Sequence, residues 1–411
     1  MSKKLNIGLF GFGCVGEGLY EVLNKSNLLN AEIKSIVVKT KNKKRTLDES
    51  YFSYDSNVIL EDPEINTVVE LIDDAEAAYI IVKKAFEKGK NVVSANKKLI
   101  AEHLDELISI AKGKNLSFLY EASVCASIPI IRNLEEYYNN DSLSGIQGIC
   151  NGTTNYILTQ TNYGKDYKTA LKEAQNLGYA ESDPTLDVDG FDSKYKLQIL
   201  IKHAFGISTS PEDIFNYGVR YVTKENVNYA LEKNYHIKLI SHAVKLADKV
   251  FGFVAPHFIK ADHPVYAVEN EFNAVIVEAL FTDRQLFVGK GAGSHPTASA
   301  VLSDISALQY NYQYEYKKAE SAKELYFSND FAIKIYLGSK NEIKLKTFDF
   351  HEKDEIFQSR EYNYITGWIS FSELLKLDFN KEEDLFFAVL PEPFKSSEYF
   401  KRSEKEELLF A

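Results

Sequence analysis

A glycine-rich turn between an apolar segment and an amphipathic one is the feature that most constrains the fold. Residues 5–10 read LNIGLF, which is typical of a buried strand, and residues 17–25 have helical spacing. The turn between them consists of Gly11, Phe12, Gly13, Cys14, Val15 and Gly16. This G-x-G-x-x-G pattern between a strand and a helix is typical of a dinucleotide-binding turn, where backbone N–H groups meet a pyrophosphate. The alternative is a glycine-rich turn that binds nothing.

Strand and helix patterns alternate through the first third of the chain. Further strand patterns occur at residues 32–38, 66–72, 90–96 and 116–122, and helical patterns at residues 75–89 and 103–115. Such alternation predicts a parallel sheet with right-handed crossovers, and ligands bind at the carboxyl ends of its strands. We therefore expect an α/β Rossmann domain at residues 1–135, with a return segment at residues 291–320.

Two positions at the ends of these strands bear on the cofactor. Ser94 and Lys97 follow one strand, so we expect Lys97 near a bound nicotinamide; the alternative is a surface lysine that opens a helix. After the second strand, Lys39 is followed by three more lysines and by Arg45, with no acidic residue before Asp48. An NAD-preferring site usually has an acidic residue there. We therefore expect NADP(H) to be preferred and NAD(H) to be accepted, although a solvated basic loop remains the alternative.

The segment from Gly178 to Lys196 gathers five acidic residues and two lysines between apolar flanks. Asp192 and Lys196 are four residues apart at the start of a predicted helix, so their side chains share one face. A carboxylate there can hold a lysine in place for proton transfer next to a carbonyl group. The alternative is an acidic surface loop with an ordinary ion pair.

Small polar residues join another predicted strand to a helix at residues 151–155. They offer hydroxyl and N–H groups to an anionic ligand, although a simple helix cap at Thr153 or Thr154 is the alternative. From residue 207 onward the patterns suit an antiparallel sheet with one face covered by helices. We expect an α+β domain at residues 136–290 and a small α+β module at residues 321–411. In that tail, strands are expected at residues 331–338, 342–350, 360–369 and 384–393, and a helix at residues 371–377.

Composition and charge exclude several classes of protein. A chain of 411 residues, 45% of them hydrophobic, suits a globular protein of two or three domains. The net charge of -11 disfavours a nucleic-acid partner. The three cysteines, Cys14, Cys125 and Cys150, lie far apart, which indicates a reducing compartment without disulfides. With no signal-peptide pattern and no run of apolar residues long enough for a bilayer, we expect a cytoplasmic protein without a membrane partner.

Six motifs occur in the order and spacing of homoserine dehydrogenases, and through them the chain resembles that family. They are GFGCVG, VVSANK, YEASV with IPI, GICNGTTNYIL, GYAESDPTLDVDGFDSKYK and VGKGAGSHPTASAVLSDI. The resemblance covers about residues 5–310. It implies the reversible reduction of L-aspartate 4-semialdehyde to L-homoserine with NAD(P)H, a step towards threonine, isoleucine and methionine. It also implies a homodimer or a higher homo-oligomer, paired through the middle domain.

The resemblance assigns roles at the matching positions. It implies that Lys196 donates a proton to the carbonyl oxygen, that Lys97 supports this transfer, and that Asp192 orients Lys196. The residues expected to bind the substrate are Glu181, Asp187, Asp192, Thr153, Gly152 and Tyr179. Those expected to bind the cofactor are Gly11, Gly13, Cys14, Val15, Gly16, Lys39, Ser94, Lys97, Gly178 and Gly291.

Proton donation by a lysine has a physical condition. Hydride addition leaves an alkoxide, so a cation or an acid must meet that oxygen. An ordinary lysine has a pKa of about 10.4 and is a poor acid at neutral pH. Two converging, partly desolvated lysines would lower one of these pKa values, whereas Asp192 would act in the opposite direction. We therefore expect Asp192 to fix the position of Lys196 rather than its acidity.

The loop at residues 124–128 departs from the family pattern because it contains no glycine. In the family this loop and the preceding glutamate bind a monovalent cation. The resemblance therefore implies a sodium site formed by the Glu121 carboxylate and by the backbone carbonyls of Val124, Ala126 and Ile128. Carbonyl ligation does not depend on the side chain, but a positive φ in this loop would strain alanine or serine.

The tail leaves more than one interpretation of the whole chain. Some members of the family end in an ACT domain that binds threonine, but residues 321–411 lack its D-x-P-G-x-L turn and its long first helix. We expect a diverged ACT-like or structural module. The alternative functions are another amino-acid dehydrogenase of the same architecture and a non-catalytic NADP-binding sensor. Substitution of Lys196 distinguishes the enzyme from the sensor.

Overall fold

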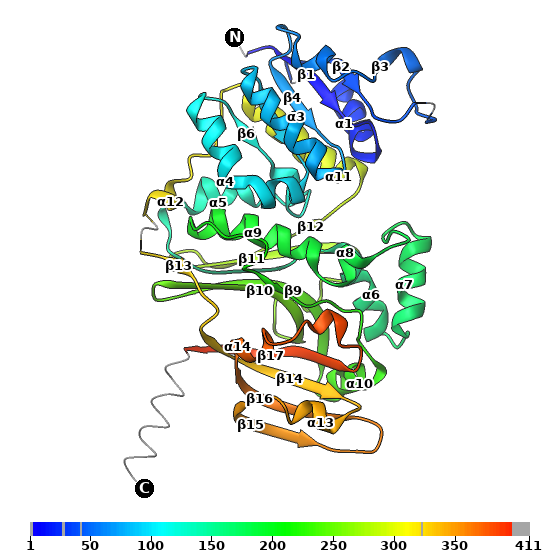
Figure 1. Cartoon of the computed structure of the whole chain (residues 1–411), viewed down its shortest axis with the longest axis vertical. Helices are drawn as coiled ribbons and strands as arrows, with labels where there is room; N and C mark the ends of the chain where they lie inside the picture. Colours follow the sequence, from blue (N-terminus) through cyan, green and yellow to red (C-terminus); the bar gives the residue numbers. More distant parts are fainter. Residues whose placement is uncertain (1–2, 27–28, 42, 322–323, 397–411) are drawn as a thin grey trace. The chain divides into compact units, whose positions relative to one another are not determined.

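The computed structural model describes residues 3–26, 29–41, 43–321 and 324–396. The chain forms two compact units, each built from three stretches of sequence (Figure 1). The first unit comprises Met1–Asn140, Gln198–Pro211 and Gly289–Ser321, and the second comprises Asp141–Leu197, Glu212–Val288 and Ala322–Ala411. No helix in the described part of the chain is long and apolar enough to span a membrane.

The first unit contains a six-stranded parallel sheet with the strand order β3-β2-β1-β4-β5-β6. The strands are β1 (Leu5–Phe10), β2 (Ala31–Val37), β3 (Phe52–Ser53), β4 (Thr67–Glu70), β5 (Asn91–Ser94) and β6 (Phe118–Leu119). The valines of β4 and β5 are completely buried, as expected for strands covered on both faces. The order reverses between β1 and β4, and ligands bind at such switch points in parallel sheets. The predicted Rossmann sheet is confirmed.

The first unit also contains seven described helices. They are α1 (Cys14–Lys25), α2 (Asn57–Leu60), α3 (Ala75–Glu87), α4 (Lys97–Gly113), α5 (Ile131–Glu135), α11 (Ser294–Leu308) and α12 (Lys317–Ser321), with 3-10 turns η1 (Glu49–Tyr51), η2 (Glu121–Ser123) and η3 (Tyr137–Asn140). Of these helices, α1, α2, α3, α4 and α11 contact strands of this sheet. Helix α11, drawn in yellow in Figure 1, comes from the returning segment and packs against α1. A Cβ atom at Gly18 would lie 2.4 Å from Ser294 Oγ and 3.0 Å from the Ser294 carbonyl oxygen, so glycine favours this close approach.

The second unit contains a mixed, largely antiparallel sheet of eleven strands. Nine strands follow the order β12-β11-β7-β9-β10-β17-β14-β16-β15, while β8 and β13 pair with β10. The strands are β7 (Leu143–Ile149), β8 (Phe215–Asn216), β9 (Tyr235–Leu246), β10 (Lys249–Lys260), β11 (Phe272–Ala279), β12 (Asp283–Lys290), β13 (Tyr326–Phe327), β14 (Phe331–Ser339), β15 (Phe350–Phe357), β16 (Asn363–Ser370) and β17 (Leu385–Ser396). The helices are α6 (Gly152–Asn162), α7 (Tyr167–Asn176), α8 (Thr185–Val188), α9 (Phe191–Phe205), α10 (Lys224–Glu232), α13 (Glu342–Leu345) and α14 (Phe371–Leu374), with a 3-10 turn η4 (Phe379–Lys381). Helix α9 begins in this unit and ends in the first.

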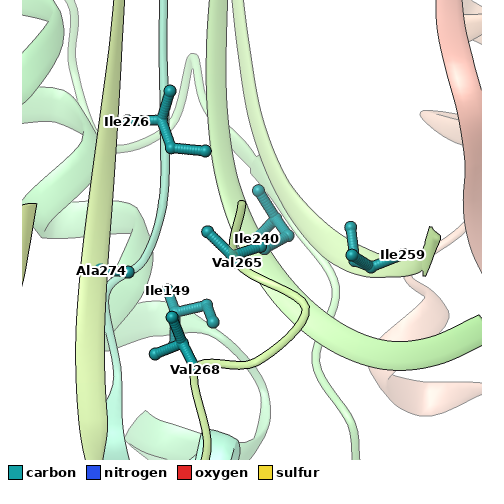
Figure 2. Close-up of a cluster of buried hydrophobic side chains, with 7 residues drawn as sticks. All are labelled: Ile149, Ile240, Ile259, Val265, Val268, Ala274 and Ile276. Carbon is teal, nitrogen blue, oxygen red and sulfur yellow. The ribbon is translucent and has the colours of Figure 1, made fainter. Parts of the chain in front are cut away.

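A cluster of buried aliphatic side chains fixes the end of β7 (Figure 2). Its members come from four strands and the segment after β10, and they are Ile149, Ile240, Ile259, Val265, Val268, Ala274 and Ile276. Complete burial of such a side chain stabilises the fold by about 1.5–3 kcal/mol. Ile149 is the last residue of β7, so this packing holds the strand end from which residues 150–153 continue.

The tail continues the sheet of the second unit. Strand β17 pairs with β10 at a bridge between His257 and Val389, and β14 pairs with β17 and β16. The predicted strand at residues 342–350 is wrong: Glu342–Leu345 is a short helix, begun by Asn341, whose Oδ1 accepts a hydrogen bond from Ile343 N at 3.0 Å. Ile343 is exposed, so the alternation of apolar residues there does not reflect burial. The boundaries of the three predicted domains remain predictions.

Candidate functional site

Asn151 is the central residue of the candidate site in the second unit. It directly precedes α6, and its Oδ1 accepts a hydrogen bond from Thr154 N at 2.8 Å, as a helix cap does. Its Nδ2 donates to Asp187 Oδ1 at 2.7 Å and to Asp192 Oδ2 at 2.9 Å. The cap fixes the orientation of the amide, since an oxygen must face the Thr154 N–H. One buried side chain therefore joins two of the predicted aspartates.

Lys196 lies beside this junction. Its Nζ donates to Asp192 Oδ2 and to the Cys150 carbonyl oxygen, each at 2.7 Å. The side chains of Lys196 and Asp192 are only 8% and 3% exposed, and they share one face of α9, as their spacing predicts. Burial makes the loss of either partner costly, because the remaining charge would have no comparable solvation. The arrangement holds an ammonium group in a fixed place at the end of β7.

The other acidic residues of this segment have separate surroundings. Asp183 accepts hydrogen bonds from Thr185 N and Oγ1, which lower the pKa of its carboxyl. Asp189 is buried and pairs with Arg220. Glu181 is exposed, and its side chain forms no hydrogen bond or ion pair within the described residues. The sequence presents one acidic cluster, whereas the structure brings only Asp187 and Asp192 to Lys196 through Asn151.

The start of α6 is packed tightly against its surroundings. A Cβ atom at Gly152 would lie 2.6 Å from the Glu271 carbonyl oxygen, so this position requires glycine. The Thr153 hydroxyl donates to the Tyr179 carbonyl oxygen at 2.5 Å. Gly178, with φ of 78°, begins the turn that brings Tyr179 there after α7. The structure thus places Thr153 and Tyr179 together, and it gives Gly178 a conformational reason to be glycine.

The glycine-rich turn of the first unit has the geometry expected of a nucleotide-binding turn. Gly11 has φ of 93°, and a Cβ atom there would lie 2.5 Å from the Leu71 carbonyl oxygen. A Cβ atom at Gly16 would lie 2.4 Å from the Gly11 carbonyl oxygen, so this glycine permits close packing of helix and strand. Gly13 faces open space, and α1 begins at the next residue, Cys14. The amide N–H groups of this helix start, including that of Val15, fit an anionic group at Gly13.

Ser94 and Lys97 lie at the end of β5. Ser94 is buried, and its hydroxyl donates to Glu70 Oε2 at 2.5 Å. Burial raises the pKa of Glu70 to about 7, although the hydrogen bonds from Ser94 and Ile72 oppose this shift. Lys97 is the first residue of α4, after the capping residue Asn96. Ser94 thus supports the strand end, and its contact with a cofactor remains a prediction.

The remaining predicted cofactor residues lie in loops. Lys39 is 90% exposed, and its Nζ is 3.6 Å from Asp74 Oδ2. Arg45 stacks on Phe52 at 4.9 Å and donates to the Thr40 carbonyl oxygen at 2.8 Å. Gly291 follows the last residue of β12 and precedes α11. In the basic loop, Lys39 therefore remains the more accessible cation, whereas Arg45 is held against the protein.

The glycine-free loop contains two left-handed residues. Cys125 and Ala126 have φ of 53° and 39°, values that non-glycine residues seldom adopt. The positive φ that would strain a non-glycine residue in this loop therefore occurs at Ala126, and also at Cys125. Val124, Cys125, Ala126 and Ile128 are all buried. The chain maintains this loop at a conformational cost, which functional sites often carry.

Glu121 supplies a buried carboxylate next to this loop. Its two oxygens accept hydrogen bonds from Ile131 N and Arg132 N, each at 2.8 Å. Burial raises the pKa of Glu121 to about 8, and the neighbouring Asp304 carboxylate adds to this shift. A bound cation would offset both effects, so the donor set fits a monovalent ion.

Sequence reasoning missed the role of Asn151 in joining Asp187 and Asp192. The residue lies inside one of the recognised motifs, but the sequence suggested a helix cap at Thr153 or Thr154, whereas the structure has the cap at Asn151. A side chain that caps a helix with its oxygen still has two N–H groups to donate. The signal that could have identified it is an asparagine, rather than serine or threonine, between a buried strand and a helix near a run of aspartates.

Comparisons with known proteins identify the family of the chain. Residues 11–121 match the family model described as homoserine dehydrogenase, NAD binding domain, and residues 129–306 match the model described as homoserine dehydrogenase. Homoserine dehydrogenase of Bacillus subtilis is 34% identical over 401 residues, which cover 94% of this chain and 91% of that protein. Homoserine dehydrogenase of Lactococcus lactis is 38% identical over 313 residues, which cover 73% of each chain.

Solved structures give the same result. A homoserine dehydrogenase from Thiobacillus denitrificans superposes with a TM-score of 0.83 at 29% identity, over 94% of this chain and 98% of that one. A hyperthermophilic archaeal homoserine dehydrogenase in complex with NADPH superposes with a TM-score of 0.66 at 28% identity, over 76% of this chain and 99% of that one. On these matches of sequence and fold, the chain belongs to the homoserine dehydrogenase family.

Proposed function

We propose that this chain catalyses the reversible reduction of L-aspartate 4-semialdehyde to L-homoserine with a nicotinamide cofactor. The observation that carries the proposal is the buried Lys196 ammonium group, held by the Asp192 carboxylate and the Cys150 carbonyl. A fixed cation beside two aspartates fits a substrate that has an ammonium group and a carbonyl oxygen to be protonated. The relatives named homoserine dehydrogenase support the same reaction.

We assign the proton transfer to Lys196. A bound nicotinamide supplies the hydride for the aldehyde carbon. As negative charge develops on the carbonyl oxygen, the proton moves to it from Lys196 Nζ. Asp192 accepts a hydrogen bond from Nζ at 2.7 Å and thereby orients the donor. Lys97 is assigned a supporting role in this transfer on the family resemblance.

Asp187 and Asp192 are proposed to bind the substrate. Asn151 holds both carboxylates in one place. Two neighbouring carboxylates favour a positively charged group of the substrate, such as its ammonium group. Asp189 is less suited to this task, because Arg220 already pairs with it. Glu181 is proposed to bind the substrate's ammonium group from the exposed part of the loop, with Gly152, Thr153 and Tyr179 lining the same site.

NADP(H) is the proposed cofactor, with NAD(H) accepted. Gly13 and the start of α1 fit the pyrophosphate, because no Cβ atom fills the space in front of the helix. Lys39 is proposed to bind the 2′-phosphate. Its pairing with Asp74 is exposed to solvent, and ion pairs of this kind are weak, so a phosphate group can replace the carboxylate.

A sodium ion is proposed as a structural cofactor. The Glu121 carboxylate and the backbone carbonyls of Val124, Ala126 and Ile128 would hold it. Hard, oxygen-only donors suit such an ion, and carbonyl donors do not depend on the absent glycines. The ion would supply charge compensation to a buried carboxylate rather than take part in the reaction.

We also propose that the chain works as a homodimer or higher homo-oligomer in the cytoplasm. The assembly is inferred from the resemblance, which implies pairing through the middle domain. Cys14, Cys125 and Cys150 form no disulfide in the described part of the chain, which suits a reducing compartment. The ACT-like character of the tail remains a prediction.

The direct test measures reduction of NADP and of NAD by the purified full-length protein, with L-homoserine as the reductant. L-Serine and L-threonine serve as comparison substrates, because they have the same charged groups and a differently placed hydroxyl. We expect turnover with L-homoserine, a higher kcat/KM for NADP than for NAD, and little turnover with the comparison substrates. Absence of homoserine-dependent reduction with both cofactors would refute the proposed function.

A further inference from the structure

The corner between α8 and α9 lies between the two aspartates that Asn151 joins. Asp187 is in α8 and Asp192 is in α9, and between the two helices the chain turns at Asp189 and Gly190. Gly190 has φ of 85°, as a sharp turn requires. The position of this corner therefore determines how Asp187 and Asp192 lie relative to each other. Its supports consist of residues that are not themselves assigned to the substrate.

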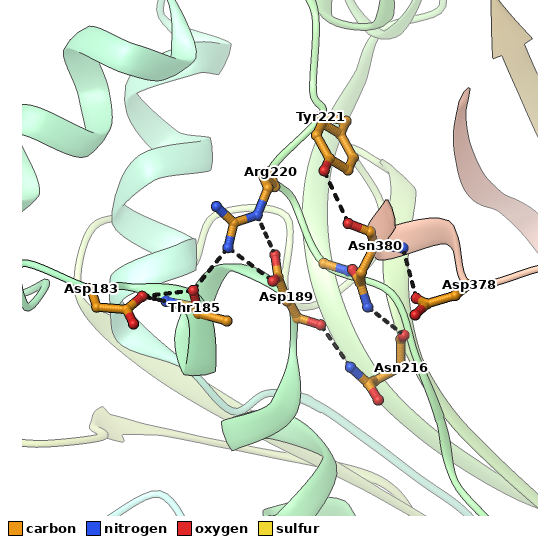
Figure 3. Close-up of polar contacts among 9 residues, drawn as sticks. Asp183, Thr185, Asp189, Asn216, Arg220, Tyr221, Asp378 and Asn380 are labelled. Carbon is orange, nitrogen blue, oxygen red and sulfur yellow. Dashed lines mark hydrogen bonds and ion pairs between the residues drawn. The ribbon is translucent and has the colours of Figure 1, made fainter. Parts of the chain in front are cut away.

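Arg220 holds the corner through its planar side chain (Figure 3). Its Nε and Nη2 donate to the two oxygens of Asp189 at 2.7 and 2.9 Å, and Nη2 also donates to Thr185 Oγ1 at 3.1 Å. The Asp189 residue is only 6% exposed. A bidentate pair of this kind fixes direction as well as distance, which a lysine cannot do. Arg220 thus joins the start of α8 to the turn that follows it.

The backbone before Arg220 packs directly against the same corner. Val219 N donates to the Val188 carbonyl oxygen at 2.7 Å. A Cβ atom at Gly218 would lie 1.8 Å from that oxygen, so only glycine allows the contact. Asn216 Nδ2 donates to the Asp189 carbonyl oxygen at 2.8 Å. Residues 216–220 therefore support the corner along its whole length.

The tail holds this supporting segment in turn. Asn380, in η4, donates from Nδ2 to the Asn216 carbonyl oxygen at 3.1 Å and accepts a hydrogen bond from Gly218 N at 3.2 Å. The Tyr221 hydroxyl donates to the Asn380 carbonyl oxygen at 3.0 Å. Asn380 itself is fixed by Asp378, whose Oδ1 accepts from Asn380 N at 3.2 Å. Figure 3 shows these contacts as one continuous chain from Asp378 to Asp183.

We propose that Arg220 and Asn380 are positioning residues for the substrate aspartates. Asn380 holds residues 216–221, and Arg220 and Asn216 hold Asp189, so that the corner presents Asp187 and Asp192 to Asn151. The C-terminal segment thereby contributes to substrate binding through the fold of its own unit. This inference rests on the proposed function, because it takes Asp187 and Asp192 as substrate ligands.

The experiment compares four variants of the full-length protein with the wild type in steady-state kinetics with L-homoserine and NADP. Arg220→Met removes the charged guanidinium group, and Arg220→Lys retains the charge without the planar group. Asn380→Ala removes both side-chain hydrogen bonds of Asn380, and Asn380→Asp removes only the one that Nδ2 donates. Asn341→Ala is the matched control, because Asn341 is likewise an asparagine of the tail whose side chain is hydrogen-bonded to the backbone, but it belongs to a different segment. Melting temperatures and cofactor affinity are measured on every protein.

We expect Arg220→Met to raise KM for L-homoserine about 10-fold and Asn380→Ala to raise it about 5-fold, whereas KM for NADP changes less than about 2-fold. Arg220→Lys should resemble Arg220→Met, since the planar group and not the charge is required. The double variant Arg220→Met with Asn380→Ala should raise KM less than the product of the single effects, because both residues act on one corner. Asn341→Ala should leave KM unchanged.

The failure of this inference and the failure of the proposed function would give different results. Variants that melt at lower temperatures but retain the wild-type KM for L-homoserine would show a purely structural role and would overturn this inference alone. A wild-type protein that does not turn over L-homoserine would overturn the proposed function together with this inference. If Arg220→Met fails to fold, the KM values of Arg220→Lys and Asn380→Asp decide the question.

Discussion

Asn151 and Asp192 lie 2.9 Å apart from Nδ2 to Oδ2, and the same oxygen of Asp192 accepts a hydrogen bond from Lys196. The carboxylate is therefore held from two sides, by an amide and by an ammonium group. Charge-assisted hydrogen bonds of this kind are stronger than neutral ones and restrict direction. Asn151 fixes the positions of the two aspartates, and Lys196 is the proposed proton donor.

Asn151→Ala should impair the use of L-homoserine and also lower the stability of the fold, because the same side chain caps α6. The change leaves Asp187 and Asp192 without the amide that joins them, and each lost charge-assisted bond is worth about 1.5–3 kcal/mol. We expect kcat/KM for L-homoserine to fall about 10- to 100-fold. Asn176→Ala, at the exposed end of α7, is the control. Wild-type kcat/KM in Asn151→Ala would contradict the assigned role.

Ala126→Gly should stabilise the protein. Ala126 has φ of 39°, and left-handed conformations cost a non-glycine residue about 1–2 kcal/mol, whereas glycine adopts them readily. The greater freedom of glycine in the unfolded chain removes part of that gain, so we expect about 0.5–1 kcal/mol more stability in urea unfolding. Ala122→Gly, at a neighbouring position without positive φ, should destabilise the protein by a similar amount. A loss of stability in Ala126→Gly would show that the loop is not strained.

Sodium should stabilise the protein more at alkaline pH. The pKa of Glu121 is raised to about 8, so between about pH 4.5 and 8 the folded state binds more protons than the unfolded state, and stability from this group falls as the pH rises. A cation at the carboxylate opposes that loss. We expect the gain in melting temperature from sodium over choline to be larger at pH 8.5 than at pH 6, and to disappear in Glu121→Gln.

A second buried carboxyl serves as the control for this effect. Glu70 also has a raised pKa, of about 7, but no loop carbonyls are proposed as ligands beside it. Glu70→Gln should therefore retain the sodium dependence. A sodium effect that is the same in Glu121→Gln as in the wild type would contradict the proposed site.

Acid should destabilise the second unit through His257. Burial lowers the pKa of this imidazole to about 3, and its Nδ1 lies 2.9 Å from the Ala255 carbonyl oxygen. Between about pH 6.5 and 3 the unfolded state binds the additional proton, so stability is lost as the pH falls through this window. At pH 5 the loss is about 2 kcal/mol, from about 1.4 kcal/mol per pH unit below 6.5.

His257→Phe should flatten the acid limb of the stability curve. Phenylalanine does not titrate, and the neighbouring Phe253 shows that the position lies among aromatic rings. Urea unfolding between pH 7 and 5 measures the slope. His351→Phe, at an exposed position on β15, is the control and should retain the wild-type slope. An unchanged slope in His257→Phe would show that other groups determine the acid limb.

Strands β1, β4 and β5 of the first unit could be predicted closely from sequence because they are short, continuous and largely buried, whereas β3, which is only half-buried, was not predicted. Residues 5–10 form β1 as expected, and the glycine turn leads into α1. Local apolar runs suffice where both faces of a strand are covered. The tail was harder, because the residues at 342–345 alternate like a strand while Ile343 remains exposed in a helix.

The site was only partly predictable for a different reason. The spacing of Asp192 and Lys196 fixes their contact within one helix. The partners of Asp187 and Asp189 come from Asn151 and Arg220, which lie more than 30 residues away in sequence. Contacts between distant segments depend on how strands and loops are arranged, and the periodicity of apolar residues along the sequence does not indicate them.

Proton donation by Lys196 is tested most directly by the turnover of L-homoserine by Lys196→Met, measured beside the wild type and Lys194→Met. Lys194 lies in the same helix and has its ammonium group over the Phe191 ring, so it controls for the loss of a lysine. If Lys196 donates the proton, kcat should fall about 100- to 10,000-fold in Lys196→Met, with NADP binding intact, and should change little in Lys194→Met. A kcat in Lys196→Met within about 3-fold of the wild type would contradict the proposed mechanism.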